Sequence, residues 1–381
     1  MVRRTRFLIG LWLGALLLGG CAAPIAPPVA LVGIGAGSAH TCALDAEGAA
    51  WCWGSNQYGQ LGTGDDENRS TRTLVSGGHL FTTLAGGGEH TCALDDDAFA
   101  WCWGRNLHGQ LGNGTNDESN EPLAASALQF LALSAGFAHT CGLDLEGYAH
   151  CWGRNFEGQL GIGSYLDAYQ PTLVSDTMKF TAITTGLSHT CALEESSGGN
   201  AWCWGSGAFG QLGDGLGTIS SVPVAVSGGA FTTIAAGVAH TCGLGKNSGG
   251  LAWCWGHNDY GQLGVGDWDP RFTPAQALGG PYLAITAGGM HTCALGKNSG
   301  GRAWCWGYGM DGQIGDGIEL SVNGPVAVDG SRIYTQISGG YDHTCALNDS
   351  GVWCWGENLF GQLGDGTQVA RSVPVGLAAP Q

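Results

Sequence analysis

Short runs of alternating apolar and polar residues, separated by glycine-rich turns, fill the chain from about residue 31 onward. One representative stretch contains four runs with the length and alternation of β-strands, at residues 222–226, 231–235, 240–244 and 252–255. A period of two places Trp253 and Trp255 on one side of their strand and Cys254 on the other. Beyond the N-terminal segment no apolar stripe has helical spacing, so the sequence predicts an all-β fold with almost no helix.

This four-strand pattern recurs seven times. Each copy contains HTC, a short variable stretch, WCWG and GQ[LI]G, except that His150 replaces the first tryptophan of the third copy. A period of about fifty residues with four strands per copy is typical of a β-propeller, whose blades close into a ring. We therefore expect one seven-bladed propeller of four-stranded blades over residues 31–381. Residues 31–37 and 372–377 each lack a partner in this division, so we expect these N- and C-terminal strands to pair and close the ring. The HTC histidines that mark the copies are His40, His90, His139, His189, His240, His291 and His343.

Fourteen of the fifteen cysteines occur in these copies, two in each. Opposed residues of adjacent antiparallel strands lie within disulfide range, and the turn between them can absorb differences in length. Reduced, packed thiols are the alternative, and zinc sites are disfavoured because no CxxC knuckle is present. The expected bridges join Cys42 with Cys52, Cys92 with Cys102, Cys141 with Cys151, Cys191 with Cys203, Cys242 with Cys254, Cys293 with Cys305, and Cys345 with Cys354.

The remaining cysteine, Cys21, follows a basic segment and an apolar run at residues 7–18. This arrangement predicts a secretory signal peptide over residues 1–20 and a proline-rich tether over residues 21–30. The ending LGGC resembles the lipobox of bacterial lipoproteins, which implies a lipid on Cys21, and Ala22 then implies sorting to the outer membrane. Ordinary cleavage in the alanine-rich stretch that follows is the alternative. Export would also permit the disulfides.

The pattern HTCAL, WCWG, GQLG resembles the regulator-of-chromosome-condensation repeat, and all seven copies match it. The resemblance implies a seven-bladed propeller and places the chain in an exported bacterial branch that includes a secreted enzyme inhibitor. Functions differ within the family, so the fold alone does not define an activity. Without the three arginines of the signal peptide, 11 Lys and Arg face 31 Asp and Glu. This acidity disfavours binding to nucleic acid.

The two residues between glycine and HTC differ among the copies, whereas their flanks repeat. By strand parity these loops share one end of the propeller. We expect the partner-binding residues Phe137, Leu187, Val238, Met290 and Tyr341 to form an apolar arc there, because such side chains often anchor protein interfaces. Trp268, the one tryptophan outside both the signal peptide and the copies, is a further candidate. Simple divergence in tolerant loops is the alternative.

The sequence contains no catalytic motif such as GxSxG or HExxH, and its acidic loops lack calcium-loop spacing. The HTC histidines belong to different copies, so we expect hydrogen bonds within each blade rather than a metal site. We therefore expect a monomeric, non-enzymatic scaffold without cofactor or metal, which is exported and touches the membrane only through its lipid. Its partner would be an unidentified extracytoplasmic protein. Alternatives are a carbohydrate-binding propeller that takes a polysaccharide, an enzyme inhibitor, and a hydrolase with a site in the central channel.

Overall fold

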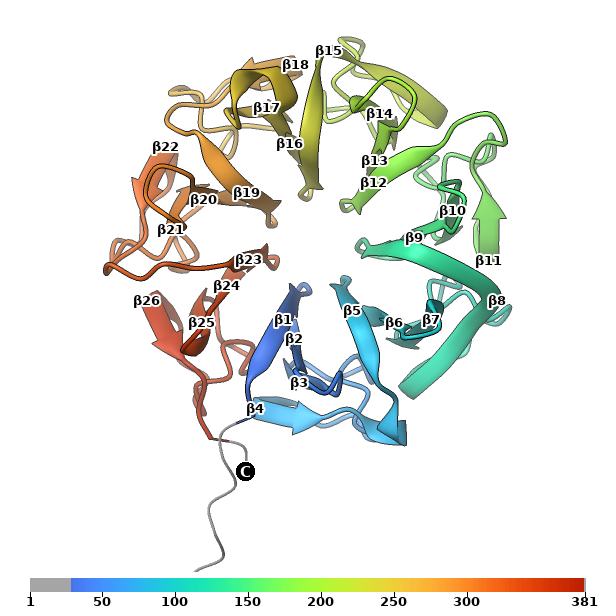
Figure 1. Ribbon diagram of the computed structural model, residues 1–381, viewed down its shortest axis with the longest axis vertical. Coiled ribbons are helices and arrows are strands. Elements are labelled where there is room, and N and C mark those ends of the chain that lie inside the picture. Colours follow the sequence, from blue (N-terminus) through green and yellow to red (C-terminus); the bar gives the residue numbers. More distant parts are fainter. Residues whose placement is uncertain (1–28, 380–381) are drawn as a thin grey trace, which may run out of the picture.

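The computed structural model describes residues 29–379, which form 26 strands and two short 3-10 turns. The strands lie in repeated blades around a central axis, so the fold is all-β and propeller-like (Figure 1). Cys21 and the expected signal peptide lie outside the described residues. Within residues 29–379, no helix has the length and apolar character needed to cross a membrane.

Each repeat contributes strands of the same four types, and we number the repeats one to seven by their HTC motifs. The strands nearest the axis are β1 (Leu31–Ala36), β5 (Phe81–Gly86), β12 (Phe180–Thr185), β19 (Tyr282–Ala287) and β23 (Gln336–Gly339). The HTC strands are β2 (His40–Asp45), β6 (His90–Asp95), β9 (His139–Asp144), β13 (His189–Glu194), β16 (His240–Gly245), β20 (His291–Gly296) and β24 (His343–Asn348). The WCWG strands are β3 (Ala50–Gly54), β7 (Phe99–Gly104), β10 (Ala149–Gly153), β14 (Asn200–Gly205), β17 (Ala252–Gly256), β21 (Arg302–Gly307) and β25 (Gly351–Gly356). The outermost strands are β4 (Arg69–Leu74), β11 (Ala168–Leu173), β18 (Arg271–Gln276), β22 (Val322–Ala327) and β26 (Arg371–Gly376).

Two long strands, β8 (Ser119–Ala135) and β15 (Ser220–Ala236), serve as the outer strand of one repeat and the inner strand of the next. They fuse neighbouring blades, so the strands form three four-stranded and two seven-stranded sheets. The 3-10 turns η1 (Ser76–Gly78) and η2 (Lys246–Ser248) lie in connections between strands.

The hydrophobic core lies between neighbouring repeats. In one cluster, the disulfide-bonded Cys42 and Cys52 of the first repeat pack with Trp103, the second tryptophan of the next WCWG motif. The same combination occurs in every core cluster. The alternation of side chains along the WCWG strand explains this combination. The cysteine and the second tryptophan point to opposite faces of the strand, so each packs against a different neighbouring repeat.

Each cysteine pair forms a disulfide between an HTC strand and the adjacent WCWG strand. The two Cα atoms are 4.1 Å apart in all seven bridges, although the sequence separation ranges from 9 to 12 residues. The hairpin turn therefore absorbs the difference in length, as the sequence suggested. Disulfides in this number are typical of an extracellular, oxidising environment.

The expected pairing of the terminal strands is not formed among the described residues. Strand β1 pairs with β2, whereas β26 pairs with β25 in a different sheet. The reason is the order of strands within a blade. Residues 222–226 pair with the preceding WCWG strand, where Ala225 lies opposite Trp202. Each blade thus begins with its inner strand and ends with its outer strand, and neither β1 nor β26 lacks a partner strand. The first and last repeats meet face to face instead, where Trp53 packs with the bridge between Cys345 and Cys354.

Candidate functional site on the loop face

Two sets of loops emerge at the same end of the propeller, which we call the loop face. One set joins inner strands to HTC strands, and the other joins WCWG strands to outer strands. Backbone hydrogen bonds tie the two sets together, as where the amide of Ser55 donates to the carbonyl of Ala39 over 2.8 Å. The variable residues before HTC therefore lie beside the residues after WCWG.

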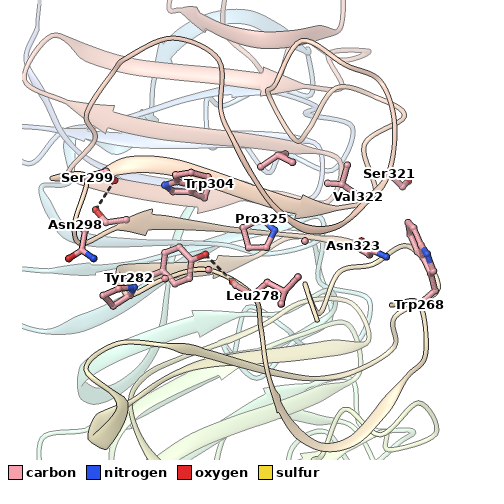
Figure 2. Close-up of a pocket in the computed structure, with 16 residues that line it drawn as sticks. Trp268, Leu278, Tyr282, Asn298, Ser299, Trp304, Ser321, Val322, Asn323 and Pro325 are labelled. Carbon is pink, nitrogen blue, oxygen red and sulfur yellow. Dashed lines mark hydrogen bonds between the residues drawn. The ribbon is translucent and has the colours of Figure 1, made fainter. Parts of the chain in front are cut away.

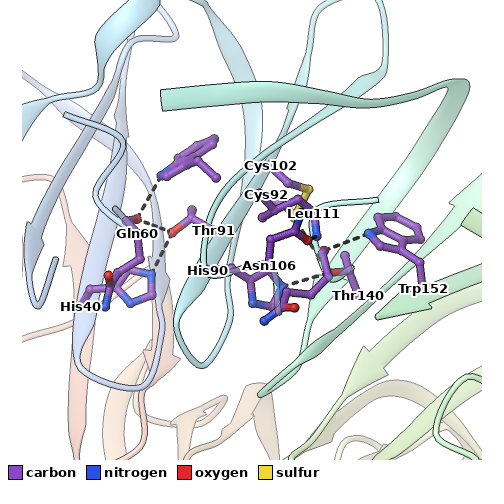
Figure 3. The surroundings of a disulfide bond; sticks show 12 residues. His40, Gln60, His90, Thr91, Cys92, Cys102, Asn106, Leu111, Thr140 and Trp152 are labelled. Carbon is purple, nitrogen blue, oxygen red and sulfur yellow. Dashed lines mark hydrogen bonds between the residues drawn. A yellow bond between two sulfur atoms is a disulfide. The ribbon is translucent and has the colours of Figure 1, made fainter. Parts of the chain in front are cut away.

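Beneath the loop face, each HTC histidine contacts the threonine of the following repeat. Nε2 of His40 lies 2.8 Å from Oγ1 of Thr91, and the Thr91 hydroxyl donates to the backbone carbonyl of Gln60 over 2.8 Å (Figure 3). Because the hydroxyl proton is used there, Nε2 of His40 is the donor in the first bond. All seven histidines make this contact. The expectation of hydrogen bonds within one blade was wrong, since the period of a repeat does not reveal contacts between repeats.

These histidines are structural groups rather than catalytic ones. Each is fully buried, and burial lowers its pKa to about 3 or 4, so the imidazoles are neutral near pH 7. The buried ring also explains the glycine that precedes the loop at Gly37, because a Cβ there would clash with the His40 ring. Among the described residues, no group of three His, Cys, Asp or Glu side chains is placed to hold a metal ion.

The structure brings four of the five expected arc residues together. Phe137, Leu187, Val238 and Tyr341 line a recess of about 80 Å³ at the propeller axis, and all four are partly buried. Met290 is not among the lining residues, because it is the second residue of its loop pair, and its Sδ lies 3.7 Å from Nε2 of Gln262. Ligand pockets usually measure about 300–1,000 Å³, so the recess is too small to enclose a metabolite.

A row of aromatic side chains crosses the loop face from the fourth to the sixth repeat. Its members are Phe209, His257, Tyr260 and Tyr308, which we call the aromatic row. The ring centroids of Phe209 and His257 are 4.9 Å apart, and those of Tyr260 and Tyr308 are 5.1 Å apart. Phe209 is 48% exposed and Tyr260 39% exposed. These two rings, each directly before the GQLG of its repeat, face solvent.

Three carboxylates lie at the end of this row, and we call Asp311, Asp342 and Glu357 the acidic cluster. Burial raises the pKa of Asp342 to about 7, and the negative charges of Glu357 and Asp311 add to that rise. Burial and Asp311 likewise raise the pKa of Glu357. Neutral amides supply the hydrogen bonds, since Nε2 of Gln313 donates to Asp342 over 3.3 Å. A cationic group from a partner would relieve the repulsion within this cluster.

Trp268 lies elsewhere. It is 45% exposed in the loop between β17 and β18, and it lines a groove of about 730 Å³ on the outer wall, beside β22 (Figure 2). None of the recess residues lines this groove. The structure therefore separates Trp268 from the apolar arc with which the sequence had grouped it.

Comparison with known proteins identifies the repeats. Family models match the regulator of chromosome condensation (RCC1) repeat at residues 31–60 and 47–94 and the RCC1-like domain at residues 83–380. The ultraviolet-B receptor UVR8 of Arabidopsis thaliana is 33% identical over 340 residues, covering 85% of this chain and 76% of the receptor. The human E3 ubiquitin-protein ligase HERC2 is 29% identical over 161 residues, which cover 40% of this chain and 3% of the ligase.

Solved structures agree on the fold. Human WBSCR16 superposes with a TM-score of 0.77 at 22% identity, covering 87% of this chain and 94% of the other. Yeast RCC1 (Prp20), in its crystal structure with Kap60, superposes with a TM-score of 0.73 at 23% identity over 85% of this chain and 82% of that chain. At these identities the likeness shows the fold alone. Together with the family models and the receptor, it establishes that this chain belongs to the RCC1 repeat family.

Proposed function

We propose that this protein is a non-enzymatic scaffold that binds an exported protein through its loop face. The observation that carries the proposal is the aromatic row, whose Phe209 and Tyr260 are exposed, beside the acidic cluster. Tyrosine and other aromatic residues are enriched in the centres of protein interfaces, where they bury large areas at low entropic cost. This surface would continue inward to four residues of the apolar arc that line the recess at the axis, Phe137, Leu187, Val238 and Tyr341. Met290 and Trp268 lie outside the recess.

The scaffold itself would be a closed ring of seven blades. Contacts between the last and first repeats support closure, because they repeat those at the other junctions. Nε1 of Trp53 donates to the carbonyl of Gln362 over 2.9 Å, as Nε1 of Trp103 donates to that of Gln60. The amide of Tyr341 donates to the carbonyl of Ser38 over 3.3 Å, which joins the loops of the last and first repeats.

The partner would present a basic and apolar segment. Asp342 and Glu357 are partly withdrawn from water, and a lysine or arginine from a partner would stabilise their charged forms. Complementary charge increases the association rate and specificity more than it increases affinity. We expect binding to weaken as salt is added, because the mature chain is strongly acidic.

In this proposal the protein is exported, anchored through a lipid on Cys21 and displayed by the tether at the outer membrane. The seven disulfides support an oxidising compartment. The acidic composition disfavours nucleic acid. The protein would act as a monomer without cofactor or metal, so that binding rather than turnover is its activity.

The test is crosslinking on intact cells, with the captured proteins identified by mass spectrometry. A double variant, Phe209→Ser with Tyr260→Ser, should reduce capture of the main partner at least about tenfold if these rings are anchors. Phe156→Ser is the matched control, since Phe156 is a 59% exposed aromatic residue of the third repeat, outside the aromatic row. Equal capture by the double variant and the wild type would refute the assignment of this face.

A further inference from the structure

In the first four repeats, an acidic side chain engages the first aromatic residue of WCWG. Nε1 of Trp51 donates to Asp45 over 2.9 Å, and Nε1 of Trp202 donates to Glu194 over 3.2 Å. Trp101 with Asp95 and His150 with Asp144 form the same pair in the second and third repeats. The acid ends the HTC strand, and its carboxylate covers the ring nitrogen.

The fifth and sixth repeats replace this acid by glycine, at Gly245 and Gly296. Among residues 29–379, the indole nitrogens of Trp253 and Trp304 have no hydrogen-bond acceptor, and neither nitrogen is sealed from solvent. A Cβ at Gly296 would lie 2.5 Å from Oγ of Ser299 and 3.0 Å from Nε1 of Trp304, and a Cβ at Gly245 would lie at the same two distances from Ser248 and Trp253. Glycine therefore leaves both indole N–H groups open to a ligand.

A cavity opens at each of these two positions. The sixth-repeat pocket is the outer-wall groove of about 730 Å³, in which Tyr282, Trp304 and Pro325 form the middle and Trp268 marks one end (Figure 2). The fifth-repeat pocket measures about 340 Å³ and is lined by Phe231, Trp253 and Pro274. The two pockets are equivalent, because each lies over the same aromatic, tryptophan and proline positions of its repeat.

The two pockets also present the same polar groups. Both hairpins read GKNSGG, so that Asn247 and Ser248 in one pocket correspond to Asn298 and Ser299 in the other. The Ser299 hydroxyl donates to the carbonyl of Gly296 over 3.1 Å, which leaves its lone pairs free to accept from a ligand. None of the described residues that line either pocket carries a charge.

We propose that the two pockets are binding sites for a neutral oligosaccharide. A pyranose ring offers C–H faces that pack on aromatic and proline surfaces, and hydroxyl groups that pair with indole N–H, amide and serine groups. Ligand sites commonly combine such an apolar lining with a few well-placed polar groups. The absence of lining charge disfavours phosphates, uronic acids and charged peptides. Equivalent pockets on neighbouring repeats suit a polymer of identical units, because both can take the same sugar.

This inference is independent of the protein-binding proposal, since no residue of the aromatic row or acidic cluster lines either pocket. The fourth repeat provides a natural comparison. Its hairpin has the same length, and Ser197 follows Glu194 by the same interval at which Ser299 follows Gly296. A glutamate at that position is therefore compatible with the local fold once the serine hydroxyl moves away from the new Cβ, and it removes the free indole N–H.

The experiment measures the binding of cellohexaose, maltohexaose and chitohexaose by isothermal titration calorimetry on the full folded domain at pH 7. We expect at least one of them to bind wild-type protein with a Kd of about 10 μM to 1 mM. Gly245→Glu and Gly296→Glu should each remove one site, and the double variant should lower affinity about tenfold or more with little change in Tm. Glu194→Gly should create a further site in the fourth repeat. The double variant Phe209→Ser with Tyr260→Ser is the control and should bind as wild type does.

Three results would overturn the proposal. One is the absence of heat from all three hexasaccharides at about 5 mM, well above the expected range. Another is undiminished binding by the Gly245→Glu, Gly296→Glu double variant. The third is binding of a decaproline peptide that both glutamate substitutions abolish, which would assign the pockets to a proline-rich protein segment. If the double variant does not fold, Glu194→Gly provides the test. A saccharide that binds the wild type but finds no additional site in the Glu194→Gly variant would also refute the inference.

Discussion

Nε2 of His343 lies 2.9 Å from Oγ1 of Thr41, although 302 positions separate the two residues in the chain. The Thr41 hydroxyl in turn donates to the carbonyl of Gln362 over 2.9 Å. Both bonds are buried, and both repeat the contacts made between consecutive repeats elsewhere. The last repeat thus meets the first through the same chemistry that joins each repeat to its successor.

Thr41→Val tests whether this junction carries stability. Valine keeps the shape of threonine but leaves the buried N–H of His343 without an acceptor, at a cost of about 1–3 kcal/mol in the free energy of unfolding. Thr140→Val is the matched control, because Thr140 contacts His90 and Gln110 in the same way between the second and third repeats. Chemical denaturation should show similar losses for both variants. A loss confined to Thr140→Val would mean that the ends of the chain are not docked.

The buried histidines predict a loss of stability in acid. Their pKa values of about 3 or 4 lie below the value of about 6.5 in an unfolded chain, so the unfolded state binds more protons between these limits. Their contribution is fully present above pH 6.5 and is lost as the pH falls toward 4. As the pH falls through this window, each histidine should lower the free energy of unfolding by about 1.4 kcal/mol per pH unit. Denaturation at pH 7.5, 6, 5 and 4.5 measures the slope, and NMR signals of the seven HTC imidazoles that titrate near pH 6.5 in the folded protein would contradict the prediction.

Asp342 should have the opposite effect on stability. Its folded pKa of about 7 lies above the usual value of 3.8, so the folded state binds the extra proton between these values. Stability therefore increases as the pH falls from above 7 toward 4. Asp342→Asn should stabilise the fold by about 1–3 kcal/mol at pH 8 and by much less at pH 5. Thermal melts at the two pH values provide the measurement, and an equal effect at both would show that Asp342 is ionised throughout.

The disulfides can be tested one repeat at a time. Alkylation of the native protein without reductant should label none of the fourteen cysteines of the repeats, as judged by mass spectrometry. Replacing Cys191 and Cys203 together by alanine should lower the free energy of unfolding by about 2–4 kcal/mol, because the bridge restricts the unfolded chain. Ser196→Ala in the same hairpin serves as a control for local disturbance. Labelled repeat cysteines, or bridges between different repeats, would contradict the assigned pairing.

The sequence predicted the features that repeat within one unit. The regular spacing of HTC and WCWG defined the strands, and the paired cysteines defined which residues face each other, as Cys42 and Cys52 do. The alternation that places Trp255 and Cys254 on opposite faces of their strand was also predicted, and the two residues pack in different core clusters. The contact of His40 with Thr91 was missed, because periodicity describes one unit and contains no information on how neighbours meet.

The remaining differences have similar causes. Residues 222–226 were assigned to the start of a blade, since sequence alone does not say whether a strand pairs with the hairpin before or after it. The aromatic row was not predicted, because its rings come from three repeats and meet only where neighbouring repeats pack, as Tyr260 does with Tyr308. The sequence shows that glycine, at Gly245 and Gly296, replaces the acid found at Asp45. The consequence could not be predicted, because it depends on where the indole nitrogen lies relative to the carboxylate.

The carbonyl of Gln60 accepts hydrogen bonds from both Thr91 and Trp103 of the following repeat. A repeat therefore cannot satisfy its own polar groups, and its neighbour completes it. An isolated repeat would expose a tryptophan, an imidazole and a carbonyl that the intact protein hides. The smallest independently stable piece should contain several consecutive repeats, and loss or gain of a whole repeat would preserve each local contact while changing how the two ends meet.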